Sequence, residues 1–267
     1  MDEATGRRGT VRPSQRSRKS EFRGARALDA AAAAGFHRPV RIIAGEFRSR
    51  RLSTPPDAEK TRPMPDRVRE GLFNLLRGHT EGQSVVDVFA GTGSVGLEAL
   101  SRGAARCVFI ERDREIGAIL KANIEALGVG DRSDVVLSDA LGPGSLARVP
   151  RPVHLVFFDP PYPLLLEEAT RRRVYEQFAR FVSLLDDEGY AALRTPWPYR
   201  TPPVIAAGVG EGPEERGDAQ ADDVAPPGAI IAPGEEIDLA IPGALGPETH
   251  LYGSTALHLY MRDPAAG

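Results

Sequence analysis

The stretch Asp87-Val-Phe-Ala-Gly-Thr-Gly-Ser-Val-Gly-Leu-Glu98 decides the fold class of this chain. It overlaps the apolar run Ser84–Phe89, which has the composition of a buried strand, and it leads into a predicted helix over Ser94–Ser101. The turn between them carries three glycines at the spacing G-x-G-x-x-G, namely Gly91, Gly93 and Gly96. A strand, a glycine turn and a helix in this order predict the first unit of a doubly wound α/β sheet, with a nucleotide-containing cofactor at the turn.

The following sequence repeats this alternation of strand and helix. Further strands are predicted at Cys107–Glu111, Val135–Ser138, Val153–Phe158 and Tyr190–Arg194, and further helices at Arg114–Leu127 and Glu167–Leu185. Near the C-terminus, Ile237–Ile241 and Leu251–Met261 have strand composition and are predicted to close the sheet as an antiparallel pair. We therefore expect a Rossmann-like α/β fold with helices on both faces of its sheet.

The segments outside this alternation differ in composition. Residues 1–39 are rich in Arg, Ser, Gly and Ala and are predicted to be a disordered basic tail. Residues 40–80 are predicted to form a hairpin and then a helix that is capped by Asp66 and ends at Gly78. The apolar stripe of that helix is Val68, Leu72, Phe73, Leu75 and Leu76. Residues 201–235 hold six Gly and six Pro, which predicts an irregular acidic insertion in a domain spanning 81–262.

Composition and charge exclude several classes of protein. Hydrophobic residues make up 41% and charged residues 27% of the 267 positions, as in ordinary folded domains. With one cysteine and five histidines at no ligand spacing, we expect neither an intrachain disulfide nor a metal site. The sequence lacks an apolar run of membrane-spanning length. The net charge of −3 conceals 18 basic against 9 acidic residues in positions 1–80, an asymmetry typical of polyanion binding or of a solvated charged tail.

Three acidic residues lie near the ends of predicted strands, toward the edge where open α/β sheets bind ligands. Asp87 would repel the pyrophosphate of a dinucleotide, so it favours a cofactor with a cationic amino-acid end, such as S-adenosylmethionine. Glu111, 20 residues after Gly91, is positioned to accept hydrogen bonds from ribose hydroxyls. Asp139 is positioned to accept a hydrogen bond from an adenine amino group, or alternatively to cap a loop.

A second motif, Asp159-Pro160-Pro161-Tyr162, follows the apolar strand Val153–Phe158 directly. Its prolines stiffen the loop that holds the carboxylate, the Pro160 carbonyl and the Tyr162 ring at the ligand edge. An exocyclic amine on a nucleobase is a poor nucleophile because its lone pair is conjugated into the ring. Asp159 and the Pro160 carbonyl are suited to accept both amine N–H groups while Tyr162 stacks on the base, which predicts catalysis at such an amine.

Together these residues resemble the Class I S-adenosylmethionine-dependent methyltransferases that act on exocyclic amino groups. The motifs that carry this resemblance are Asp87–Glu98, Glu111, Asp139-Ala140 and Asp159–Tyr162. Further segments look like the RsmD family, the bacterial 16S rRNA (guanine(966)-N(2))-methyltransferases, and they are Arg41–Gly45, Arg51-Leu52, Thr61–Asn74, Tyr252-Gly253 and Leu257–Tyr260. The resemblance covers about residues 40–195 and 250–261.

This resemblance implies a seven-stranded methyltransferase fold and methylation of a guanine N2 in small-subunit rRNA. The expected protein is a cytoplasmic monomer without membrane contact, whose partner is 16S rRNA in a partly assembled 30S particle. The resemblance adds Phe89, Ala90, Arg112 and Ala140 to the expected cofactor site. It makes Arg41, Arg48, Arg50, Arg51, Arg62, Arg67 and Arg69 the candidate RNA surface, although Arg67 and Arg69 equally fit solvated helix charges.

The chain departs from the family pattern in its tail, in its acidic insertion, and at Arg194-Thr195, where an acidic residue is expected after the fifth strand. Other functions also stay open. A DNA adenine-N6 methyltransferase uses the same Asp159–Tyr162 chemistry, and a non-catalytic RNA-binding assembly factor fits the basic N-terminal region. A dehydrogenase rests on the glycine motif alone and is opposed by Asp87 and by Asp159–Tyr162.

Overall fold

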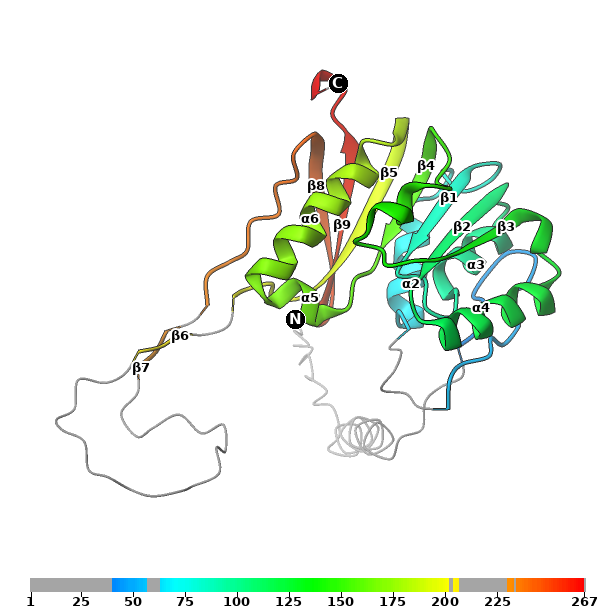
Figure 1. The fold of residues 1–267 in the computed structure, drawn as a ribbon, viewed down its shortest axis with the longest axis horizontal. Coiled ribbons are helices and arrows are strands. Elements are labelled where there is room, and N and C mark those ends of the chain that lie inside the picture. Colours follow the sequence, from blue (N-terminus) through cyan, green and yellow to red (C-terminus); the bar gives the residue numbers. More distant parts are fainter. Residues whose placement is uncertain (1–39, 57–62, 202–203, 207–229, 233, 267) are drawn as a thin grey trace, which may run out of the picture. The chain divides into compact units, whose positions relative to one another are not determined.

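Seven strands form one mixed sheet in the order β3-β2-β1-β4-β5-β9-β8 (Figure 1). This computed structural model describes residues 40–56, 63–201, 204–206, 230–232 and 234–266. The five parallel strands are β1 (Ser84–Val88), β2 (Arg106–Glu111), β3 (Ser133–Leu137), β4 (Val153–Phe158) and β5 (Leu185–Pro196). Two antiparallel strands, β8 (Ala244–Tyr252) and β9 (Thr255–Arg262), complete the sheet, and β6 (Val204–Ala206) pairs with β7 (Ile230–Ala232) in a separate ribbon.

The helices pack on both faces of this sheet, as the continuous apolar strands require. Side chains of α2 (Asp66–Leu75), α3 (Ser94–Ser101) and α4 (Arg114–Leu127) form one core with Val85 and Leu155. Those of α5 (Tyr162–Leu166) and α6 (Glu168–Val182) form a second core with the next residue of each strand, Val86 and Val156. Short 3₁₀ turns lie at Gly130–Arg132, Pro143–Leu146 and Pro264–Ala266. The expected seven-stranded α/β fold is confirmed.

The closing antiparallel pair differs from the sequence-based expectation. Ile237–Ile241 forms no strand. Its two isoleucines are buried in the α6-side core, and the Ile237 amide makes a single backbone hydrogen bond to the Tyr199 carbonyl. The stretch Leu251–Met261 contains a turn at Gly253, whose φ is +64°, and therefore contributes to both β8 and β9. The outer strand β8 is mostly polar and contains Gly246-Pro247, which is why its composition did not predict a strand.

The predicted helix after Pro65 exists but begins and ends differently. Pro65 is its N-cap residue, and Asp66 is its first helical residue and makes no cap hydrogen bond to the backbone. The Asp66 carboxylate accepts hydrogen bonds from Arg69 and Arg41 instead, because basic side chains lie within its reach. The helix ends at Leu75, and Gly78 follows with a φ of +89°. The predicted cap at Asp66 is therefore wrong, whereas the buried apolar stripe is confirmed except for the half-buried Leu75.

Residues 40–52, here called the N-terminal arm, form a tight hairpin-like loop rather than two regular strands. A single antiparallel bridge joins Arg41 and Arg51, and the Ile42 amide donates to the Arg50 carbonyl at 2.9 Å. Turn structure occupies residues 46–49, and the residues Gly45 and Ser49 both have positive φ. The arm is consequently held by its contacts with the sheet domain more than by its own backbone pairing.

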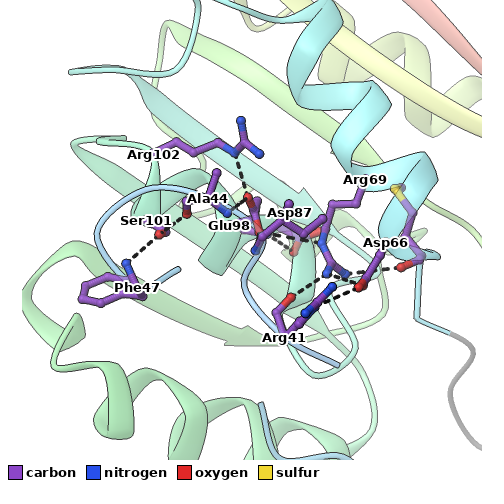
Figure 2. Close-up of polar contacts among 12 residues, drawn as sticks. Arg41, Ala44, Phe47, Asp66, Arg69, Asp87, Glu98, Ser101 and Arg102 are labelled. Atoms are coloured by element: carbon purple, nitrogen blue, oxygen red, sulfur yellow. Dashed lines mark hydrogen bonds and ion pairs between the residues drawn. The ribbon is translucent and has the colours of Figure 1, made fainter. Parts of the chain in front are cut away.

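The helix α3 supplies most of these contacts (Figure 2). The fully buried Glu98 carboxylate accepts the Ile43 and Ala44 amides at 2.7 and 3.0 Å. One turn further along the helix, the Ser101 hydroxyl accepts the Phe47 amide and donates to the Ala44 carbonyl. Since α3 begins at the glycine turn, one helix connects the arm to that turn.

Within the described ranges, none of the helices is long and apolar enough to cross a membrane. The predicted disordered tail 1–39, most of the predicted insertion 201–235, and Arg62 lie outside the described residues.

Candidate active site

The carboxyl ends of the parallel strands meet at one edge of the sheet, as the register requires. Val88 is level with Ile110 on β2 and with Phe158 on β4, and Phe158 is level with Leu193 on β5. The residues that follow these positions therefore lie at the same edge: Phe89 to Gly93, Glu111 with Arg112, Asp139 with Ala140, Asp159 to Tyr162, and Arg194. The sequence-predicted cofactor and amine motifs thus share the edge at which open α/β sheets bind ligands.

The three glycines of the turn have different roles. A Cβ atom on Gly91 (φ +56°) would meet nothing within 4 Å, so this residue borders open space. A Cβ on Gly93 would lie 2.4 Å from Leu120 Cδ1, and one on Gly96 would lie 2.4 Å from Phe109 Cε1. Gly93 therefore allows the turn to approach α4, Gly96 allows α3 to pack closely on β2, and Gly91 leaves room for a ligand beside the backbone.

The Asp87 side chain is buried against the glycine turn and does not face solvent. Its side chain is 2% exposed, and its carboxylate accepts the Gly96 amide at 2.8 Å. Burial raises the pKa of this carboxyl well above its usual range, against the lowering effect of the Gly96 hydrogen bond. We expected Asp87 to contact a ligand directly. In the structure, its carboxylate holds the glycine turn against the start of α3.

Glu111 and Asp139 bring two further carboxylates to the edge. Glu111 accepts the amides of Gly91 and Asp113 at 2.9 and 2.8 Å, so it ties β2 to the glycine turn. Asp139 is exposed, and it accepts the Leu141 amide at 3.1 Å, which also makes it a loop cap. Each carboxylate oxygen has two lone pairs, so both residues keep acceptor capacity for a ligand. Nearby, Arg112 is exposed, Ala140 is buried, and Phe89 and Ala90 lie in the turn.

The Asp159–Tyr162 motif has a partner that sequence reasoning missed. Arg194, the departure from the family pattern, donates from Nε to Asp159 Oδ1 at 2.6 Å. Both side chains are largely buried, at 11% and 15% exposure. Burial raises the pKa of the Asp159 carboxyl, and the Arg194 charge and hydrogen bond oppose that rise. The only sequence signal was the unexpected base after the fifth strand.

Tyr162 is the first residue of the short helix α5, which the sequence did not predict. Pro161 is the N-cap residue of this helix, and Pro163 lies in its first turn, where a missing N–H breaks no helical hydrogen bond. The Tyr162 hydroxyl hydrogen-bonds the Thr255 hydroxyl at 3.0 Å, and the Arg194 guanidinium carbon lies 5.4 Å from the centre of the Tyr162 ring. The ring is thus fixed between β9 and Arg194.

The candidate RNA-binding arginines divide into exposed and buried residues. Those with exposed side chains are Arg41, Arg48, Arg50, Arg51 and Arg67. Arg41 pairs with Asp66, and Arg50 donates to the Ala126 carbonyl. Arg69 is fully buried, so its assignment to an RNA surface is wrong; its guanidinium bonds the Arg41 carbonyl and the Asp66 carboxylate.

Comparison with known proteins identifies the family. The model of the family described as "Conserved hypothetical protein 95" matches residues 40–179. Ribosomal RNA small subunit methyltransferase D of Escherichia coli (strain K12) is 40% identical over 153 residues, which are 57% of this chain and 70% of that protein. The chain belongs to the RsmD family.

Other members of this family and its solved structures agree with that assignment. The putative rRNA methyltransferase YlbH of Bacillus subtilis (strain 168) is 34% identical over 124 residues, covering 46% of this chain and 67% of that one. The structure of the putative methyltransferase yhhF from Escherichia coli matches with a TM-score of 0.59 and 28% identity, covering 86% of this chain and 100% of that one. The family match contains the arm, the glycine turn and Asp159–Tyr162, and ends before Arg194.

Proposed function

We propose that this chain transfers a methyl group from S-adenosylmethionine to the exocyclic N2 of a guanine in 16S rRNA, the residue numbered 966 in the family, during assembly of the small ribosomal subunit. Methylation of small-subunit rRNA is supported by the Escherichia coli relative, whose name states that activity. The finer assignment to guanine N2 comes from the family resemblance and from the chemistry of the Asp159–Tyr162 motif.

One observation carries the proposal: the Asp159 carboxylate and the Gly91 side of the turn share one edge of the sheet. β1 and β4 are hydrogen-bonded neighbours, so the residues that follow Val88 and Phe158 emerge next to each other. A donor of a methyl group and an amine that receives it need this proximity.

The residues at this edge fit S-adenosylmethionine better than a dinucleotide. Two carboxylates, from Glu111 and Asp139, lie at this edge beside the glycine turn, and open space borders Gly91. This negative edge favours a cationic amino-acid end and disfavours a pyrophosphate. Glu111 and Asp139 would hold the ribose hydroxyls and the adenine amino group, and the turn braced by Asp87 would border the amino-acid end.

The chain's own residues prepare the amine for transfer. Asp159 and the Pro160 carbonyl accept the two N–H groups of the target amine, which turns the nitrogen lone pair out of conjugation with the base. Tyr162 stacks on the base after it leaves its RNA stack. When bound, S-adenosylmethionine would supply an electrophilic methyl group next to this nitrogen. The amine loses its proton after transfer, because a methylated amino cation is strongly acidic, so Asp159 needs no raised pKa as a base.

Residues 40–80 are proposed as the RNA contact and residues 81–262 as the catalytic domain. The exposed side chains of Arg48, Arg51 and Arg67 are suited to phosphate contacts, which supply affinity and salt dependence without reading sequence. Because Glu98 and Ser101 bind the arm to α3, RNA bound by the arm would lie at a fixed position relative to the glycine turn.

The first experiment measures transfer of labelled methyl from S-adenosylmethionine to protein-free 16S rRNA and to partly assembled 30S particles, followed by nucleoside digestion. Recovery of N2-methylguanosine supports the proposal, and a preference for the particle identifies it as the substrate. N6-methyladenosine would instead indicate an adenine methyltransferase. RNA binding without transfer to RNA or DNA would indicate an assembly factor.

A variant pair tests the role of Asp159. Asp159→Ala is expected to bind S-adenosylmethionine like the wild type and to lose methyl transfer by at least about 100-fold, because the amine loses its charged acceptor. The control Asp131→Ala removes an exposed carboxylate in the turn Gly130–Arg132, away from the ligand edge, and is expected to retain full activity. Wild-type turnover in Asp159→Ala contradicts the assigned role.

A further inference from the structure

Arg194 connects the two parts of the proposed amine site. Its Nε donates to Asp159 Oδ1 at 2.6 Å, and its guanidinium carbon lies 5.4 Å from the centre of the Tyr162 ring. The register of β4 and β5 makes this contact possible. Phe158 on β4 is level with Leu193 on β5, and the residues that follow them are Asp159 and Arg194. The Tyr162 hydroxyl is held by a hydrogen bond to the Thr255 hydroxyl.

The surroundings of Asp159 make its ionised form costly without Arg194. Burial raises the pKa of the Asp159 carboxyl, and Arg194 is the group that lowers it. Asp159 and Glu111 in turn raise the pKa of the buried Asp87 on β1, and Asp87 supplies no compensating cation. The Tyr162 and Thr255 hydroxyls are uncharged, and burial lowers the pKa of His258, on β9, to about 4, so it is neutral as well. Arg194 is thus the cation that offsets this negative edge at Asp159.

The protonation state of Asp159 decides whether its side chain can accept a hydrogen bond from the target amine. An ionised carboxylate only accepts hydrogen bonds. A protonated carboxyl carries an O–H donor, and this donor would face the N–H donor of the amine without an acceptor between them. Arg194 donates to Oδ1, which leaves Oδ2 as the oxygen that would accept one amine hydrogen, while the Pro160 carbonyl would accept the other.

We propose that Arg194 is a positioning residue of the amine site: it fixes the Asp159 carboxylate as an anion, in one orientation, beside the Tyr162 ring. This rests on the proposed methyl transfer to an exocyclic amine. It concerns a feature of this chain, because the family pattern predicts an acidic residue at this position and the family match ends at residue 179. Arg194 acts through Asp159 and Tyr162 and needs no contact with the base.

The test compares Arg194→Met, which keeps an unbranched apolar stem but removes the guanidinium and its charge, with Arg194→Lys, which keeps the charge but loses the Nε donor. The first readout is the pH titration of the Asp159 side-chain carboxyl by ¹³C NMR in the free protein. Its midpoint is expected to rise by about one to three pH units in Arg194→Met and by less in Arg194→Lys. The control Arg148→Met removes an exposed arginine paired with Asp134 and is expected to leave the midpoint unchanged.

The second readout is single-turnover methyl transfer to the RNA substrate across pH. The acid limb of the Arg194→Met profile is expected to move upward with the titration midpoint, a tenfold loss of rate per unit on that limb, and to approach the wild type at high pH. An unchanged midpoint overturns the proposal, as does a rate that exceeds the wild type at every pH, which would mean that Arg194 competes with the base. If the wild type transfers no methyl group, the proposed function fails, while the titration still decides whether Arg194 holds Asp159 ionised.

Discussion

Replacement of Glu98 by Gln tests how the N-terminal arm is held. Glu98 is fully buried on α3, and its carboxylate accepts the amides of Ile43 and Ala44 and the Nε of Arg102 at 2.7, 3.0 and 2.8 Å. The buried Arg69 Nε lies 3.8 Å from the same carboxylate, with no hydrogen-bond partner of its own. A glutamine keeps the shape of the side chain but removes the charge and replaces one acceptor with a donor.

The expected loss of stability follows from these contacts. Whichever way the amide is oriented, its NH₂ group meets at least one backbone N–H, which leaves a buried donor unsatisfied at a cost of about 1–3 kcal/mol. Burial lowers the pKa of the Arg69 guanidinium, and Glu98 is the first of the groups that favour its charged form. Breaking a buried ion pair costs about 3–5 kcal/mol of unfolding free energy when the remaining charge is left unpaired. Asp66 still pairs with Arg69, so we expect Glu98→Gln to lose about 3 kcal/mol, the lower end of that range.

Urea unfolding followed by circular dichroism measures this loss. The control Glu125→Gln makes the same charge change at an exposed position of α4 and is expected to stay within about 0.5 kcal/mol of the wild type. Hydrogen exchange at the Ile43 and Ala44 amides reports the arm directly and is expected to accelerate in Glu98→Gln only. If the two variants unfold at the same urea concentration, the arm does not depend on the Glu98 contacts and the reasoning is refuted.

Three further predictions concern the arm, the core and the RNA surface. Gly45 has a φ of +81°, and a Cβ there would lie 1.8 Å from the Ser101 carbonyl oxygen. Gly45→Ala is therefore expected to lower the free energy of unfolding, measured in urea, by more than about 2 kcal/mol. The control Gly82→Ala, with φ +74° and nothing within 4 Å, is expected to lower it by about 1 kcal/mol. The pKa of the buried His258 is lowered from 6.5 to about 4, so the unfolded chain binds more protons between these values; thermal unfolding is expected to show stability rising with pH across that window, and His258→Asn to show a shallower rise. Arg48→Gln/Arg51→Gln is expected to weaken RNA binding and to reduce the magnitude of the slope of log affinity against log salt by about 1–2, and an unchanged slope argues against phosphate contacts from the arm.

The elements that the sequence predicted well are those whose signal is local. The helices Ser94–Ser101 and Arg114–Leu127 and the strand Val153–Phe158 have the predicted boundaries, because a glycine turn, a helical apolar pattern and an apolar run are each contained in a short stretch of sequence. The structure adds that Asp113 caps the second of these helices. The errors fall where packing overrides composition. Ile237 and Ile241 are apolar enough for a strand, but their side chains are buried in the core and the segment forms no strand. The polar segment β8 is a strand because β9 pairs with it.

The sequence by itself determined the fold class and which residues reach the ligand edge, because parallel strands end at one edge and Asp87, Glu111, Asp139 and Asp159 all lie at or near strand ends. Only the tertiary structure decided what these residues contact. In the folded chain, Asp87 binds the Gly96 amide, and Asp159 pairs with Arg194, which is 35 residues further along the sequence. Arg69 is buried beside Glu98. Such pairings depend on strand register and helix packing between distant segments, which local sequence patterns do not encode.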